Sequence, residues 1–218
     1  MKSFCIVGLS QFGISLARTL AAEGAQVMVV DRDSEEVNEL ADLVTDAAIG
    51  DPTSPQFLQA AGVTDYDCSV VCLSGGIDES LLATLALKDL GVKEVIARAG
   101  SEEHRRILEK IGADSVVFPE RDAATKQGFA MARENVTDFV DISDEYSIIT
   151  ITMPPSWVGR SLVQLAIRRK HNVTVVALKK AGSDKTDINL DPDRPFEAGD
   201  VITLLGSNED TVKIAKVK

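Results

Sequence analysis

The stretch that ends at Asp31 constrains the fold of this chain most. An apolar run at residues 4–7 leads into the loop Gly8-Leu9-Ser10-Gln11-Phe12-Gly13, and apolar positions at helical spacing follow the loop. A second apolar run, residues 26–30, then ends in the acid. Strand, glycine loop, helix, strand and terminal acid in this order predict the beginning of a nucleotide-binding Rossmann unit.

The residues of this stretch have predicted roles in holding a nucleotide. Gly8 allows the chain to turn sharply, and Gly13 allows the helix to pack closely on the first strand. The amide groups at the start of the helix offer unpaired N–H donors to a phosphate. Asp31 is placed to accept both hydroxyls of an adenosine ribose and to repel a 2′-phosphate.

The middle position of the loop departs from the usual pattern. It is Ser10, where a glycine would allow the closest approach of a pyrophosphate, so the loop predicts a nucleotide without requiring a dinucleotide. Ser10 either lends its hydroxyl to a phosphate or caps the helix that begins near Gln11, and the sequence leaves both roles open.

Strand and helix patterns alternate through the first part of the chain, which indicates an α/β fold. The predicted strands are residues 4–7, 26–30, 47–49, 69–73, 94–98 and 115–118. The predicted helices after the first are residues 34–43, 55–61, 78–90 and 102–111, with Ser34 as the cap of the earliest. Such alternation predicts a doubly wound parallel sheet covered by helices on both faces.

The pattern changes after a helix expected at residues 121–134. Strands are predicted at residues 136–142, 147–153, 173–178, 187–190 and 201–205, and helices at residues 161–170 and from residue 210 onward. This pattern is typical of a small α+β module. We therefore expect two domains, residues 1–135 and 136–218.

Polar residues collect where the predicted parallel strands end. Ligands of open α/β sheets bind beyond the carboxyl ends of the strands. The residues at those ends are the glycine loop, Asp31, Asp51, Ser74-Gly75-Gly76, Arg98 and Glu120. Asp51, which precedes a proline, could instead be a turn or capping residue, and Arg98 could be a surface charge.

Composition limits the classes of partner. The net charge of −11 and the lack of a basic stripe argue against nucleic acid as a partner. No apolar run reaches the roughly 18 residues of a membrane span, so we expect no direct membrane insertion. The cysteines lie in apolar runs without metal-ligand spacing, which favours free thiols in a reducing cytoplasm.

The chain has little equipment for catalysis. Its two histidines, His104 on a charged helix face and His171 at a helix end, are both expected to be solvated. No Ser/His/Asp or Cys/His set is evident, and the tyrosines lack a nearby lysine. These features favour a protein that is not an enzyme. A small NAD(H)-dependent oxidoreductase, or a nucleotide sensor that acts on some other protein, is the alternative.

The helix expected at residues 78–90 is apolar around most of its circumference. A helix that covers one sheet face needs only an apolar stripe, so we expect this helix to be buried on a second side. The second side is either inside the monomer or, as we favour, in a subunit contact.

Several motifs, in their order along nearly the whole chain, resemble one known family. They are the glycine loop, Val30-Asp31, Ile49-Gly50-Asp51, residues 108–114, Phe118-Pro119-Glu120-Arg121-Asp122 and residues 165–168. The chain resembles the RCK (KTN) regulatory subunits of bacterial Ktr/Trk-type potassium uptake systems. The resemblance implies an RCK N-terminal domain and an RCK C-terminal domain. It also implies that dimers assemble into a cytoplasmic ring, an octamer, which lies peripheral to the membrane beneath a potassium channel subunit.

The resemblance also implies ligands and residue roles. ATP or ADP, and sometimes NAD(H), would bind with Asp31 on the ribose, Asp51 near the adenine and Arg98 near the phosphates, while Glu120 would hold a divalent cation (Mg or Ca) at a dimer interface. The expected contact residues are Gly8, Ser10, Gln11, Phe12, Gly13, Asp31, Arg32, Asp51, Ser74, Arg98 and Glu120. Gln11 stands where the family usually has an arginine that reaches a γ-phosphate.

The C-terminal module resembles domains that in some members bind cyclic di-AMP between two subunits. Arg168 fits the pattern of those domains, whereas Ala166, Asn172 and Thr174 differ from it. The resemblance leaves open whether this module binds cyclic di-AMP.

Overall fold

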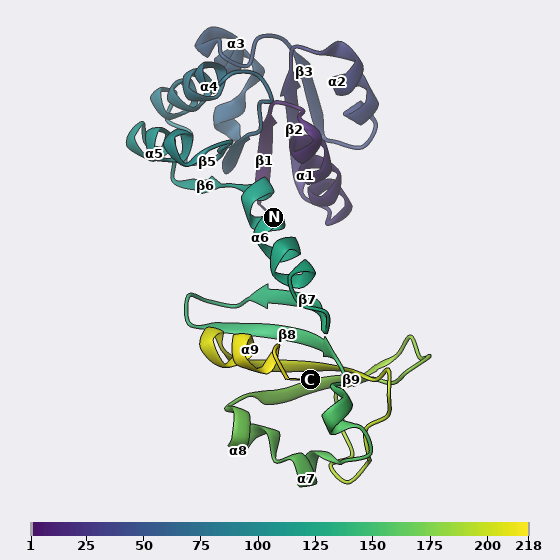
Figure 1. Ribbon diagram of the computed structural model, residues 1–218. Helices are drawn as coiled ribbons and strands as arrows, with labels where there is room; N and C mark the ends of the chain where they lie inside the picture. Colours follow the sequence, from purple (N-terminus) through teal and green to yellow (C-terminus); the bar gives the residue numbers. More distant parts are fainter. Residues whose placement is uncertain (1, 218) are drawn as a thin grey trace. The chain divides into compact units, whose positions relative to one another are not determined.

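The computed structural model describes residues 2–217. The chain divides into two compact units, one up to Arg121 and one from Asp122 on, and each is described by itself (Figure 1). Within residues 2–217, no helix combines the length and the apolar character that crossing a lipid bilayer requires.

The first unit is built on a six-stranded parallel sheet. Its strands are β1 (Ser3–Val7), β2 (Gln26–Asp31), β3 (Asp46–Ile49), β4 (Cys68–Val71), β5 (Glu94–Arg98) and β6 (Ser115–Val117). They lie in the order β3-β2-β1-β4-β5-β6, and Val7 at the end of β1 is in register with Val30 and Val71 on either side. The order reverses between β1 and β4, which is where doubly wound sheets bind ligands.

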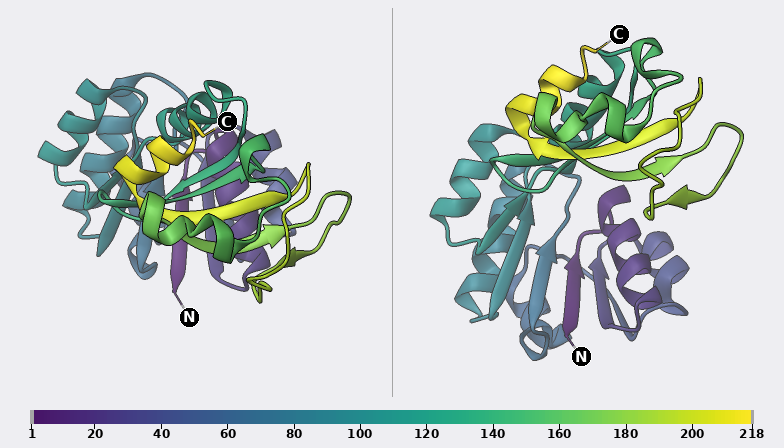
Figure 2. Two further views of the ribbon diagram at one scale, coloured as in Figure 1. Left: turned by 60° about the horizontal axis from the view of Figure 1, so that its bottom comes forward. Right: turned by 90° about the horizontal axis from the view of Figure 1, so that it is seen from below.

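Helices cover both faces of this sheet, as the sequence predicts (Figure 2). They are α1 (Gln11–Ala22), α2 (Ser34–Ala41), α3 (Pro55–Ala61), α4 (Ile77–Asp89) and α5 (Glu102–Lys110), with a 3-10 turn at Val63–Asp65. Cys5 and Val7 of β1 belong to one buried cluster with Leu58 and Leu87, while Ile6 belongs to the cluster on the opposite face. The α/β doubly wound class is confirmed.

The cap of α2 differs from the prediction. Ser34 is the first helical residue, and Asp33 is the cap, since its carboxylate accepts hydrogen bonds from the amides of Glu35 and Glu36. An aspartate and a serine are nearly equal capping residues, so two adjacent candidates cannot be ranked by residue type.

The second unit contains a five-stranded antiparallel sheet. Its strands are β7 (Val136–Asp141), β8 (Tyr146–Thr152), β9 (Thr174–Lys179), β10 (Thr186–Asp187) and β11 (Val201–Ser207), in the order β10-β9-β11-β8-β7. Helix α6 (Pro119–Met131) begins within the first unit and continues into this one. The other helical segments are a 3-10 turn at Pro155–Trp157, α7 (Leu162–Leu165), α8 (Ile167–His171) and α9 (Asn208–Ile214). The core lies on one face of the sheet and contains Ile149, Ile202 and Leu204.

The single helix predicted at residues 161–170 is wrong. Ala166 has a φ of 47°, a left-handed conformation, and separates α7 from α8. The predicted strand 187–190 is also too long on its C-terminal side, because Asn189 donates its amide to the Asp187 side chain in a turn directly after β10.

Helix α6 explains why contacts in the structure and patterns in the sequence divide the chain at different residues. Phe129 and Ala130, near its C-terminal end, pack against the core of the second unit, so contacts divide the chain at residue 121. The sequence places the boundary after residue 135, at the change of pattern. That domain boundary stays a prediction.

Candidate functional site

The two glycines of the first loop are each required by a close approach. Gly8 has a φ of 99°, and a Cβ built on it would lie 2.6 Å from the amide nitrogen of Leu73. A Cβ on Gly13 would lie 2.3 Å from the carbonyl oxygen of Gly8 and 3.0 Å from the Cβ of Cys72. Both glycines therefore have the steric reasons that the sequence suggested, a tight turn and close packing of α1 on the sheet.

Ser10 caps α1. Its hydroxyl accepts the amide N–H of Gly13 at 3.4 Å. Capping is one of the two roles considered for this residue, and a contact of the hydroxyl with phosphate stays a prediction. Gln11 is exposed and Phe12 half-buried at the start of the helix.

Asp31 connects the end of β2 to the glycine loop. Its Oδ2 accepts the amide of Leu9 at 2.6 Å, and its Oδ1 accepts the amide of Asp33 at 3.0 Å. A carboxylate has about four acceptor positions, so two remain for the hydroxyls of a ribose. We call the carboxyl ends of β1, β2 and β4, with the loops that follow them, the switch-point site.

Arg32 lies between two carboxylates at this site. It forms ion pairs with Glu79 of α4 at 3.0 Å and with Asp51 at 3.5 Å. Asp51 also accepts the backbone amide and the hydroxyl of Thr53, at 2.9 and 2.8 Å, as a turn residue does. These hydrogen bonds from Thr53, with a smaller contribution from Arg32, lower the pKa of the Asp51 carboxyl. Sequence reasoning missed Glu79, because its partner is distant along the chain.

Arg98 and Glu120 are brought together, as their shared position at the sheet edge suggests. The Arg98 side chain is 20% exposed, donates to the carbonyl oxygen of Leu73 at 3.5 Å and forms an ion pair with Glu120. The Arg98 hydrogen bond holds the pKa of the Glu120 carboxyl below its usual value. Arg98 is therefore a half-buried, paired cation at the end of β5.

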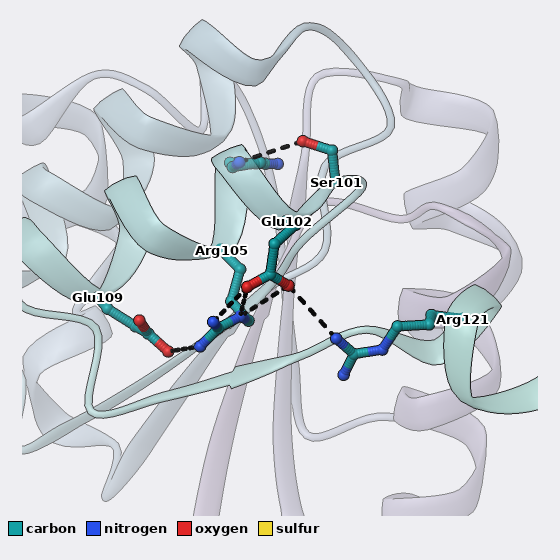
Figure 3. Close-up of polar contacts among 6 residues, drawn as sticks. Ser101, Glu102, Arg105, Glu109 and Arg121 are labelled. Atoms are coloured by element: carbon teal, nitrogen blue, oxygen red, sulfur yellow. Dashed lines mark hydrogen bonds and ion pairs between the residues drawn. The ribbon is translucent and has the colours of Figure 1, made fainter. Parts of the chain in front are cut away.

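A second ion-pair network joins the beginnings of α5 and α6 (Figure 3). Glu102 accepts from Arg105 and, at 3.4 Å, from Arg121, and Arg105 also pairs with Glu109. The Arg105 hydrogen bond lowers the pKa of Glu102. Glu120 thus forms an ion pair with Arg98 of β5, and Arg121 forms one with Glu102 of α5.

The expectation that His104 is solvated is wrong. Its side chain is 5% exposed, and its Nδ1 accepts the amide of Gly100 at 3.3 Å. Ser101 caps α5, because its hydroxyl accepts the amide of His104 at 3.1 Å. Burial, and then the charge of Arg98, lower the pKa of His104. The charged neighbours of His104 in sequence lie on the outer side of the same helix.

The loop between β4 and α4 completes the site. Ser74 is exposed in this loop. A Cβ on the next residue, Gly75, would lie 2.0 Å from Oε2 of Glu79, so the carboxylate rests where a side chain would otherwise project. A ligand contact of Ser74 stays a prediction.

The donor set for a metal at Glu120 is small. Among residues 2–217, no group of three or more His, Cys, Asp or Glu side chains could hold a metal ion. Mg²⁺ is commonly bound by one or two carboxylates together with substrate phosphates. Glu120, beside Arg98, fits only this mode of binding, in which phosphates supply the other ligands. Cys5, Cys68 and Cys72 are buried free thiols, as expected, and burial raises their pKa values to about 12, 11 and 12.

The second unit has a hollow of about 310 Å³ at the junction of α7 and α8. It is lined by Leu162, Ala166, Ile167, Arg168, Arg169, Thr174 and Val175. Three of the residues considered for cyclic di-AMP therefore line one hollow. Asn172 is the left-handed residue that ends α8.

Comparisons with known proteins agree with this two-part architecture. Residues 4–119 match the TrkA-N domain model, and residues 146–217 match the TrkA-C domain model. Ktr system potassium uptake protein C of Bacillus subtilis is 34% identical over 217 residues, which are 99% of this chain and 96% of that protein.

Solved structures share the fold. The GsuK channel superposes with a TM-score of 0.69 at 17% identity, over 99% of this chain and 39% of that chain. The GsuK channel bound to NAD gives a TM-score of 0.52 at 21% identity, over 98% of this chain and 38% of that one. The present chain thus spans about two fifths of each channel chain. By its two domain matches and its full-length relative, the chain belongs to the family of TrkA-N and TrkA-C domain proteins that includes the Ktr system potassium uptake proteins.

Proposed function

We propose that this protein is a regulatory subunit of a potassium uptake system. It binds an adenine nucleotide, ATP, ADP or NAD(H), at the switch-point site and thereby gates a membrane-embedded potassium-translocating partner. The observation that carries the proposal is the 34% identity to a Ktr system protein along 99% of the chain. The NAD bound to the GsuK channel, which shares this fold, supports the choice of ligand.

The side chains of the site suit such a ligand. The amides at the start of α1 would donate to a phosphate, Asp31 would accept the ribose hydroxyls at its remaining acceptor positions, and Arg98 would supply a cation. Glu120, released from Arg98, would hold a divalent cation against the phosphates. Cyclic di-AMP in the hollow beside Arg168 stays a prediction for the second unit.

Regulation of this kind requires only that the nucleotide binds, and no bond of the nucleotide need be broken. Moving a two-state gate from 1:99 to 99:1 takes about 5.5 kcal/mol in total. Shared among about eight sites of a ring, that is roughly 0.7 kcal/mol for each site. One altered charge-assisted hydrogen bond contributes about 1.5–3 kcal/mol, so a single rearranged phosphate contact in each subunit is sufficient.

The proposed assembly is a ring of dimers, an octamer, peripheral to the cytoplasmic face of the membrane through its partner. Helix α4 supports a subunit contact, since Leu82 and Leu85 are 54% and 42% exposed on the side away from the sheet core. Apolar side chains exposed together on one helix are typical of an interaction surface.

Calorimetric titration with ATP, ADP, NADH and NADPH, with and without magnesium, tests the ligand. We expect binding of an adenosine phosphate or of NADH, and exclusion of NADPH. Reconstitution with a Ktr-type membrane subunit then tests regulation, because ligand should change potassium flux. Steady consumption of NADH with a carbonyl substrate would instead support an oxidoreductase.

A further inference from the structure

Arg32 occupies the position next to the ribose-binding acid at the end of β2. In dinucleotide-binding folds an acid at this place selects a free 2′-hydroxyl, whereas an arginine nearby accommodates a 2′-phosphate. This chain has both residue types side by side, as Asp31 and Arg32. The sequence alone therefore leaves two opposite preferences at the ribose.

The structure shows what occupies the Arg32 guanidinium. Its Nη1 donates to Oε1 of Glu79 at 3.0 Å, and its Nη2 donates to Oδ1 of Asp51 at 3.5 Å. The shorter contact comes from α4, which follows β4. Since β1 lies between β2 and β4, this ion pair joins elements on either side of the glycine-loop strand.

The position of the Glu79 carboxylate depends on Gly75. The Oε2 atom lies where a Cβ of residue 75 would be, at 2.0 Å, so only a glycine leaves the carboxylate its place over the β4–α4 loop. The Glu79 side chain is 29% exposed, against 53% for Arg32 and 57% for Asp51. Of the two partners of Arg32, Glu79 is thus the closer and the more shielded from solvent.

We propose that Glu79 is a specificity-determining residue of the switch-point site. By holding Arg32, its carboxylate withholds that guanidinium from a 2′-phosphate, so the site accepts adenosine ligands with a free 2′-hydroxyl. The inference rests on the proposed binding of nucleotide at this site. It adds to the repulsion by Asp31 a second means of excluding 2′-phosphorylated ligands.

The test compares two probes on the full-length protein by calorimetry, 5′-ADP and adenosine 2′,5′-bisphosphate. The measured quantity is the ratio of their dissociation constants. In Glu79→Gln we expect the ratio to move toward the 2′-phosphorylated probe by about fivefold, the change that one exposed ion pair can provide. In the double variant Glu79→Gln with Arg32→Ala, the ratio should return to the wild-type value.

Two further variants keep the interpretation clear. Gly75→Ala should displace the carboxylate without removing its charge, and should move the ratio in the same direction. Glu103→Gln, an exposed site on α5, removes the same charge elsewhere and should leave the ratio unchanged.

Contrary results have separate meanings. Wild-type protein that binds ADP, with a ratio unaltered by Glu79→Gln, would refute the inference and leave the proposed function standing. A shift in Glu79→Gln that persists when Arg32 is removed would also refute it. Wild-type protein that binds neither ADP nor NADH would refute the proposed function, and the inference with it.

Discussion

The carboxylate of Asp31 accepts the backbone amide of Leu9 at 2.6 Å. The acid at the end of β2 therefore holds the glycine loop that follows β1, in addition to the role that sequence suggests for it on the ribose. The geometry of the loop and the proposed recognition of the ribose therefore depend on the same side chain. Substitution at this position should affect both.

Replacing Asp31 by alanine should abolish nucleotide binding and also loosen the loop. The amides of Leu9 and Asp33 lose their acceptor. The Leu9 contact is partly buried, and an unpaired donor there costs about 1–3 kcal/mol, whereas the exposed Asp33 amide can bond water. We expect a lower midpoint in urea denaturation together with the loss of a calorimetric binding signal. Asp42→Asn, at an exposed position, is the control. Retained binding in Asp31→Ala would show that the ligand lies elsewhere.

Replacing Gly13 by alanine should destabilise the first unit. The new Cβ would lie 2.3 Å from the Gly8 carbonyl oxygen, and overpacking of this kind costs about 1–3 kcal/mol. Gly128→Ala on α6 is a matched control, because nothing lies within 4 Å of its Cβ and alanine favours helices. The two free energies of unfolding should change in opposite directions.

The stability of the first unit should fall in acid partly through Asp67. Hydrogen bonds from Lys93 and from Ser3 lower the pKa of this carboxyl to about 2. The unfolded value is about 3.9, so the contribution is present above about pH 4 and is lost as the pH falls through 2. Melting temperatures of wild type and Asp67→Asn should therefore differ at neutral pH and converge near pH 2. A constant difference would contradict this assignment.

Polar substitution on the exposed face of α4 should lower the number of subunits in the oligomer. Leu82 and Leu43 are both 54% exposed, but only Leu82 lies on the helix proposed to form a subunit contact. We expect a smaller mass by light scattering for Leu82→Gln and an unchanged mass for Leu43→Gln. Equal masses for both variants and wild type would remove α4 from the interface.

The order of strands and helices could be predicted because local signals agree with it. Glycines, caps and apolar runs fix the beginning of each element, and parallel strands then bring the residues that follow them to one edge. The positions of Asp31, Asp51 and Arg98 at this edge were predicted in this way. The ion pair of Arg32 with Glu79 was harder to predict, because it joins residues 47 positions apart in the sequence.

Backbone conformation and burial account for the errors. Alanine rarely adopts the left-handed conformation, so the break at Ala166 could not be predicted from residue type or from the helical pattern. His104 follows two glutamates and precedes two arginines, which made its helix face look solvated. In the structure the histidine is on the inward side of that helix, where the amide of Gly100 gives it a partner.

The buried cysteines give this protein a chemical reporter of unfolding. Thiolate is the reactive form, and burial both shields the sulfur atoms of Cys5, Cys68 and Cys72 and raises their pKa values. Maleimide dyes should leave the native molecule unlabelled and modify it only after the first unit opens. A single cysteine introduced at the surface could then carry a fluorophore with no native thiol removed.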